Sequence, residues 1–133
     1  MKMVIGFFSA GFLVLLSPHV HAGSTTPAKQ VETLVSLSGV QPNINSGREF
    51  FTNKHGREWS CSSCHTVDPT GLGKHVKTGK VIQPMAPVEN PDRFTDAAKT
   101  EKWFRRNCSD VIGRECTPEE KSDVLAWLLS LKK

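Results

Sequence analysis

The sequence predicts a small all-α domain with long irregular loops, and three observations lead to this fold class. Several segments carry apolar residues at the three- and four-residue spacing of a helix. The stretch 66–94 is rich in glycine and proline and shows neither helix nor strand periodicity. The part of the chain that follows an N-terminal export signal is the size of one domain.

The chain begins with the features of a secretory signal peptide. Lys2 precedes an apolar run, which is followed by a small-x-small cleavage pattern that ends at Ala22. An uncleaved membrane anchor is the alternative, but the run is shorter than the ~20 residues of a spanning helix and a proline interrupts it. We expect removal of residues 1–22, leaving residues 23–133 as a single periplasmic domain of 111 of the 133 residues.

The charge balance is mild. The chain has 17 lysines and arginines against 13 aspartates and glutamates, a formal net charge of +4. This excess is too small to indicate a nucleic-acid partner and supports at most a loose preference for an acidic partner surface. Export also places the four cysteines in an oxidising compartment, where paired cysteines usually form disulfides.

Two of these cysteines belong to the motif CSSCH, formed by Cys61, Cys64 and His65. This is the spacing of c-type haem attachment, in which two thiols add to the haem vinyl groups and the adjacent histidine coordinates iron. A thioredoxin-like site would need a βαβ pattern, a zinc site would need a second ligand cluster, and a plain disulfide would leave His65 unexplained. The motif therefore predicts one covalent haem c, with His65 as the proximal ligand.

The expected helices follow in chain order. Residues 27–39 carry apolar side chains at helical spacing, and Gly39 is the expected stop. A second helix is expected to start near Ser46 and to end at Gly56, just ahead of the haem motif. The stretch 66–94 is expected to wrap one edge of the haem, because so long a loop is unusual in a small domain unless it is functional.

A third helix is expected over FTDAAKTEKWFRRNC, with Thr95 as its cap. Trp103, Phe104 and Asn107 fall at helical spacing and therefore share one face. If this face packs on the porphyrin, Trp103 and Phe104 contact the haem and Asn107 points at it.

The last helix has the clearest sequence signals. Thr117 and Glu120 make a capping box, and Pro118 suits the first helical position. Four apolar residues of this helix share a face, from Val124 to Leu131, and the opposite face is polar.

A short helix before CSSCH, a loop around the haem edge and a capped C-terminal helix resemble the class I cytochrome c fold. CHTVDPTGLGKHVKTG is also similar to the corresponding stretch of mitochondrial-type cytochromes c. In that family a proline follows the glycine, and its carbonyl accepts a hydrogen bond from the haem histidine. Lys80 stands there in this chain, which leaves Pro69 as a candidate acceptor for the His65 ring.

The motifs CSSCH, PMAPVENPDRFTD and WFRRNC…GREC resemble more specifically the oxygen-binding monohaem cytochromes c known as sphaeroides haem protein. The resemblance implies that Asn107 is the sixth iron ligand in the oxidised state and leaves on reduction, which opens the iron to O2. It also implies a Cys108–Cys116 disulfide near the haem. Such a nine-residue closed loop stabilises a fold by about 2.6 kcal/mol on the chain-entropy model.

The same resemblance bears on activity and partners. It implies binding of O2 or another diatomic such as CO or NO, oxygen reduction or nitric oxide chemistry, and electron transfer from a membrane b-type or multihaem c-type cytochrome. We expect a monomer with no nucleic-acid partner.

Three alternatives to Asn107 stay open. Met85 in QPMAP is flanked by prolines, which suits a haem methionine, although it lies only 20 residues from His65. If Met85 is not a ligand, it is expected to be soft apolar filler. His55 and His75 are expected to be solvent-exposed, and an empty site comes last. A permanent His65/Met85 pair would make the protein a plain electron-transfer cytochrome. A gas sensor is a third possible function, and it would need a separate partner protein that detects whether the ligand is bound.

Overall fold

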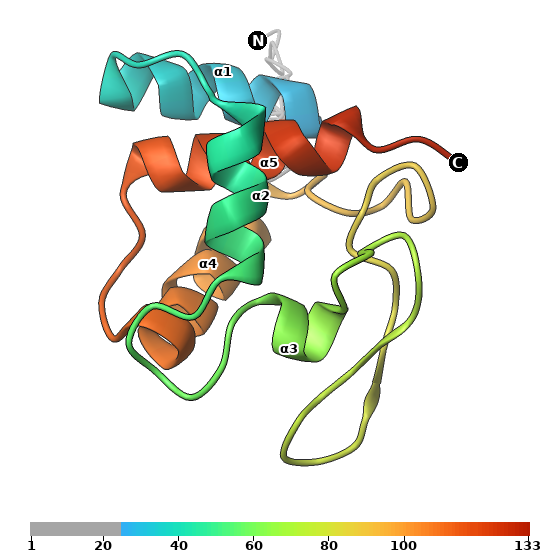
Figure 1. Cartoon of the computed structure of the whole chain (residues 1–133). Helices are drawn as coiled ribbons and strands as arrows, with labels where there is room; N and C mark the ends of the chain where they lie inside the picture. Colours follow the sequence, from blue (N-terminus) through green and yellow to red (C-terminus); the bar gives the residue numbers. More distant parts are fainter. Residues whose placement is uncertain (1–24) are drawn as a thin grey trace, which may run out of the picture.

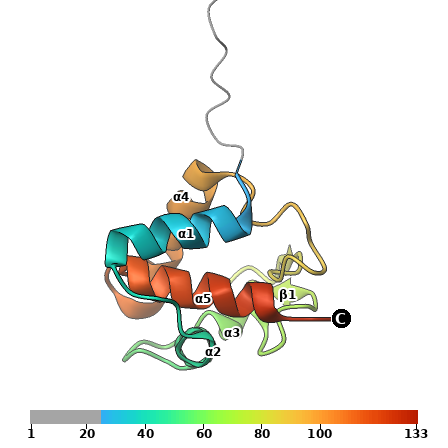
Figure 2. The ribbon, with the colours of Figure 1, turned by 90° about the horizontal axis from the view of Figure 1, so that it is seen from above.

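The C-terminal helix lies at the centre of the fold in the computed structural model, which describes residues 25–133. The elements are α1 (Pro27–Ser38), α2 (Ile44–Thr52), α3 (Ser62–His65), β1 (Gly73–Lys74), β2 (Val81–Ile82), α4 (Ala97–Ile112) and α5 (Pro118–Ser130). α1 lies alongside α5, and α2 crosses it (Figures 1 and 2). The predicted signal peptide lies outside the described residues. No helix within residues 25–133 is long and apolar enough to cross a membrane.

The first helix has the predicted bounds. The Thr26 side chain accepts the Lys29 N–H, and Gly39 ends the helix in the left-handed conformation with φ +72°. The predicted apolar face is wrong at Leu37, which is 69% exposed, whereas Gln30 is buried. Gln30 Nε2 donates to the Phe94 carbonyl and, at 3.2 Å, to Thr100 Oγ1 on α4.

The second helix starts two residues before the predicted Ser46 and ends four residues before Gly56. Asn43 is its cap, because its side-chain oxygen accepts the N–H groups of the first turn. The Asn43 N–H in turn donates to Asp123 Oδ1 of α5 at 2.7 Å. This long-range contact fixes where the helix begins.

Gly47 brings α2 into direct backbone contact with α5. A Cβ at this position would lie 2.9 Å from Val124 N and closer still to the carbonyl group of Asp123. Gly47 is buried, and Phe51 follows one turn later in the core. The missing side chain therefore lets α2 place Phe51 against the centre of the fold.

The region after the haem motif contains a small hairpin, so the prediction of no strand there was wrong at residues 73–82. β1 and β2 pair antiparallel, with Gly73 opposite Ile82 and Lys74 opposite Val81. Strands of two residues each are too short to give a periodic signal. The Lys77 ammonium at the hairpin tip lies 4.6 Å from the centre of the Trp59 ring, which connects the hairpin to the segment before CSSCH.

The fourth helix is capped by Asp96 rather than by the predicted Thr95, because the Asp96 side chain accepts the Lys99 N–H. It continues past Cys108 to Ile112 and ends at Gly113, where φ is +78°. The close helix pairs of the described residues are α1 with α5 and α2 with α5. α4 is attached mainly through a few specific links, including the ion pair of Glu101 with Lys121, 2.7 Å long.

The last helix has the predicted capping box, with Thr117 and Glu120 bonded reciprocally. Its apolar residues Val124, Trp127 and Leu128 form the core cluster together with Phe51 of α2. Polar residues of this helix are buried as well, namely Lys121, Ser122 and Asp123. They are buried because α5 is covered by neighbours on several sides.

Candidate haem-binding site

The CSSCH motif folds into a single helical turn. The N–H groups of Cys64 and His65 both donate to the Cys61 carbonyl, at 3.3 and 3.1 Å. Neither thiol is part of a disulfide, both residues are half-buried, and burial raises the pKa of Cys61 to about 11. Two unpaired thiols one turn apart are the groups that haem attachment requires.

The hairpin fixes this turn from the side. Gly73 of β1 packs against the backbone of the motif, where a Cβ would lie 3.1 Å from the Cα of His65 and closer to the Cys64 carbonyl. Only glycine allows this approach without displacing the motif. β1 therefore positions the segment that carries Cys64 and His65.

His65 is held in its neutral form. Burial, together with the positive charge of Arg93, lowers the pKa of His65 to about 4. Its ring lies against the core, 6.2 Å from the centre of the Phe51 ring. A neutral imidazole keeps the nitrogen lone pair that iron coordination needs. The donor set of two thiols and one neutral imidazole fits haem c.

The Pro69 carbonyl, the candidate acceptor for the His65 ring, is occupied by other donors. The Pro69 carbonyl accepts the N–H groups of Met85 and Ala86, at 2.9 and 3.0 Å, which uses both of its lone pairs. Within residues 25–133, neither nitrogen of the His65 ring makes a hydrogen bond. Sequence reasoning missed the contact of Pro69 with Met85 and Ala86, because this contact joins two segments that only the tertiary fold brings together.

The aromatic face of α4 is divided between the core and solvent. Phe104 packs against the core cluster, as does Cys61 of the haem motif. Trp103 is 46% exposed, with the Arg106 guanidinium 5.6 Å from its ring centre. The structure thus brings Phe104, but not Trp103, to the cluster that Cys61 contacts.

Asn107 lies one turn beyond Phe104 on the same helix. Its side chain is half-buried and makes no hydrogen bond to another described residue. No buried side-chain nitrogen or oxygen of the described residues lacks a hydrogen-bond partner, so the amide atoms of Asn107 are accessible at the surface. Asn107 is thus free to engage a ligand that the chain itself does not supply.

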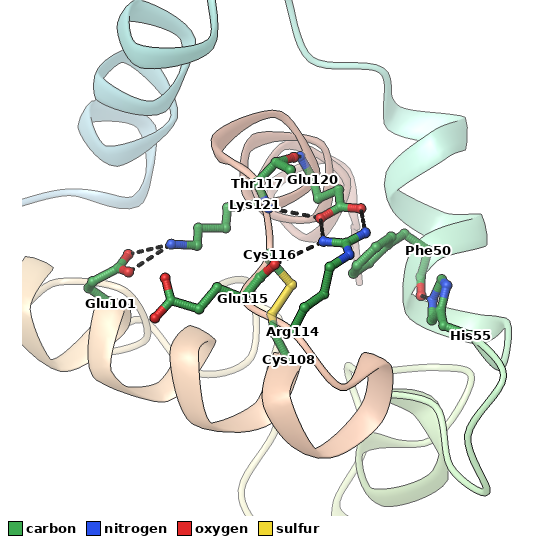
Figure 3. The surroundings of a disulfide bond; sticks show 10 residues. All are labelled: Phe50, His55, Glu101, Cys108, Arg114, Glu115, Cys116, Thr117, Glu120 and Lys121. Atoms are coloured by element: carbon green, nitrogen blue, oxygen red, sulfur yellow. Dashed lines mark hydrogen bonds and ion pairs between the residues drawn. A yellow bond between two sulfur atoms is a disulfide. The ribbon is translucent and has the colours of Figure 1, made fainter.

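A disulfide joins Cys108 to Cys116 (Figure 3). Both residues are buried, their Cα atoms are 5.7 Å apart, and the bond ties the last turns of α4 to the start of α5. Between them, Arg114 makes two hydrogen bonds to the Glu120 carboxylate, which reinforces the capping box. The disulfide therefore fixes the backbone directly beside Asn107.

The other candidates for the sixth ligand, Met85, His55 and His75, all contact other parts of the chain. Met85 packs against the core cluster as predicted for apolar filler. The prediction that His55 and His75 are exposed was wrong, because both are half-buried. His55 Nε2 lies 2.8 Å from the Phe50 carbonyl, and His75 Nδ1 accepts two backbone N–H groups of the hairpin turn.

Arg93 was missed at the level of sequence. It is half-buried, and it is the charged group that acts on His65. It lies 28 positions from His65 in a stretch without periodicity, and no sequence signal marks the contact. Within residues 25–133 no three His, Cys, Asp or Glu side chains cluster as a metal site.

The helical fold and this donor set define a small c-type cytochrome. A family described as "Domain of unknown function (DUF1924)" matches residues 38–128. The chain is 46% identical over 119 residues to the cytochrome c-type protein SHP of Cereibacter sphaeroides, which covers 86% of this chain and 91% of that protein. It is 38% identical over 141 residues to cytochrome c'' of Methylophilus methylotrophus, with 98% of each chain covered.

The solved structures that resemble this one are structures of the same two proteins. Oxidised SHP, described as an oxygen-binding cytochrome c, superimposes with a TM-score of 0.77 and 44% identity over 82% of this chain and all of that one. Oxidised cytochrome c'' gives 0.72 and 38% identity over 80% of this chain and 95% of that one. The solution structure of cytochrome c'', which concerns haem-ligand detachment in that protein, gives 0.70.

The chain belongs to the DUF1924 family and, within the c-type cytochromes, to the type represented by sphaeroides haem protein. It carries covalently bound haem c. The predicted fold class, family and cofactor are confirmed.

Proposed function

We propose that the protein is a periplasmic cytochrome that accepts an electron, releases Asn107 from the haem iron on reduction, and then binds O2 or another diatomic. Cys61 and Cys64 attach the haem, and His65 is the proximal ligand. The haem iron supplies the one-electron chemistry and the coordination position for the diatomic. SHP, the relative at 46% identity, is itself described as oxygen-binding, which supports the proposal.

The observation that carries the proposal is the unpartnered amide of Asn107. Most half-buried polar groups of the described residues are hydrogen-bonded, but Asn107 is not, although it lies beside the buried Cys108. An amide oxygen is a weak, hard ligand that suits ferric better than ferrous iron. Reduction would therefore release Asn107, and its freed N–H could donate to a bound diatomic.

The position of Met85 supports Asn107 over the plain electron carrier. The Met85 N–H donates to the carbonyl of Pro69, only four residues after His65, and its side chain packs on the core cluster. Met85 is thus pinned to the segment that carries the proximal histidine. A permanent His65/Met85 pair would need the methionine on the opposite face of the haem.

The test is the absorption spectrum of the holoprotein, oxidised, reduced without oxygen, and reduced with carbon monoxide. We expect a high-spin ferrous spectrum that shifts when carbon monoxide is added. Asn107→Ala should change the ferric spectrum while haem remains attached. Asn45→Ala, which removes an exposed amide from α2, is the matched control and should leave all three spectra unchanged.

Two results would contradict the proposal. A low-spin ferrous spectrum that ignores carbon monoxide would show that a strong ligand is retained. If Met85→Leu then opened the iron while Asn107→Ala had no effect, the plain electron-transfer function would replace the proposal. The periplasmic location is tested separately, by fractionation and by the N-terminal residue of the mature protein, expected to be Gly23.

A further inference from the structure

Arg93 differs from the other cationic side chains in its combination of burial and pairing. Within residues 25–133, every lysine and arginine is exposed except Lys121 and Arg93. Lys121 is paired with the Glu101 carboxylate. Arg93 has no carboxylate within ion-pair distance among the described residues. A half-buried cation costs free energy unless a negative group compensates it.

Backbone carbonyls hold the Arg93 guanidinium in one orientation. Its Nε donates to the Pro84 carbonyl at 2.9 Å, and its Nη2 donates to the Gln83 carbonyl at 2.7 Å. The Asn90 side chain donates to the same Pro84 carbonyl at 3.3 Å. Two of the five guanidinium N–H groups are therefore used, and Nη1 still has both of its protons available.

The segment around the fixed guanidinium packs on the core cluster that the haem motif also contacts. Phe94, the chain neighbour of Arg93, packs against this cluster, as do Met85 and Cys61. The His65 ring lies 6.2 Å from the Phe51 ring of the same cluster. Haem c carries two propionate groups. Carboxylates are the preferred partners of a guanidinium, because its planar N–H groups match their two oxygens.

We propose that Arg93 binds a haem propionate through its free N–H groups and that its charge favours the ferrous state. The propionate supplies the negative partner that the chain does not provide. A positive charge held near the iron stabilises the less positive oxidation state, and the effect is large where burial excludes water. Arg93 is thus a positioning residue that anchors the haem edge and raises the reduction potential.

The experiment compares Arg93→Gln and Arg93→Lys with the unaltered holoprotein. Arg93→Gln removes the charge and should shift the reduction equilibrium about tenfold toward the oxidised form, a potential about 59 mV lower for a one-electron couple. Arg93→Lys keeps the charge and should leave the potential close to that of the unaltered protein. Arg48→Gln removes an exposed arginine from α2 and should change neither quantity.

The resonance Raman propionate-bending band reports the hydrogen bond directly. It should shift in both Arg93 variants, because the guanidinium donor is lost in each, and stay unchanged in Arg48→Gln. An unshifted band, or an unchanged potential in Arg93→Gln, would overturn the proposal. If Arg93→Lys lowered the potential as far as Arg93→Gln does, the charge of Arg93 would not set the potential. Arg93 would then only hold its loop in place, and the proposal would be overturned. Should Arg93→Gln not accumulate, the Raman band of Arg93→Lys still decides.

Discussion

Gly47→Ala should destabilise the protein, although alanine favours helices. Gly47 is in the interior of α2, where replacing glycine by alanine usually stabilises by about 1 kcal/mol. Here the new methyl group would overlap the carbonyl of Asp123 and lie 2.9 Å from Val124 N. Both atoms belong to the backbone of α5 and cannot rotate away, so the two helices must separate.

The size of the effect follows from these two opposing contributions. Forcing an extra methyl group into a packed contact costs about 1–3 kcal/mol, and overlap with backbone places the cost at the upper end of this range. With the helix propensity subtracted, we expect a net loss of about 2 kcal/mol. For a domain of this size, the melting temperature should fall by about 8 °C.

Denaturant unfolding of the holoprotein, followed by circular dichroism, measures this loss. Ser46→Ala is the control, because Ser46 is exposed on the same helix and its substitution should be neutral or slightly stabilising. If Gly47→Ala were as stable as the unaltered protein or more stable, α2 and α5 would not meet at Gly47, and this account of the fold would be refuted.

Three further predictions concern the site and its supports. Replacing Cys108 and Cys116 together by alanine should cost about 2.6 kcal/mol by denaturant unfolding, and the unaltered denatured holoprotein should show no free thiols; two would remove the disulfide. Arg114 lowers the pKa of Glu120 through their hydrogen bonds. Stability from that pair is therefore present above the unfolded pKa and lost as pH falls, so Glu120→Gln should cost up to about 1 kcal/mol at pH 7 and nothing at pH 2. Met85→Leu should leave the ferric spectrum unchanged, and a new ferric spectrum would make Met85 a ligand.

Local sequence signals predicted the parts of the fold that local interactions determine. Gly39 ends α1 because a left-handed residue there costs glycine nothing, and the α5 capping box involves residues three positions apart. The start of α2 was predicted less well, since its cap depends on Asp123, which lies 80 positions away. The short hairpin carries no periodic signal, and only its place beside the haem motif gives it a role.

The residues of the haem site also differ in whether local sequence signals could predict them. Cys61, Cys64 and His65 are recognisable because haem attachment demands a fixed local spacing. Arg93 was not recognisable, because its role depends on carbonyls and a histidine that the fold brings to it. Helical spacing placed Asn107 on the face of Trp103 and Phe104, but its role as a ligand is implied by the resemblance alone and stays a prediction.

The two proposals act in opposite directions on the reduction potential. A positive charge at Arg93 favours the ferrous state, and the ferrous state is the one that binds the Asn107 amide weakly. Because binding and reduction are linked, a ligand that prefers ferric iron lowers the reduction potential by the same free energy with which reduction weakens that ligand. Arg93 would offset this lowering, so that a donor cytochrome can still reduce the protein while Asn107 occupies the iron. Asn107→Ala and Arg93→Gln should therefore move the potential in opposite directions, upward for the first and downward for the second.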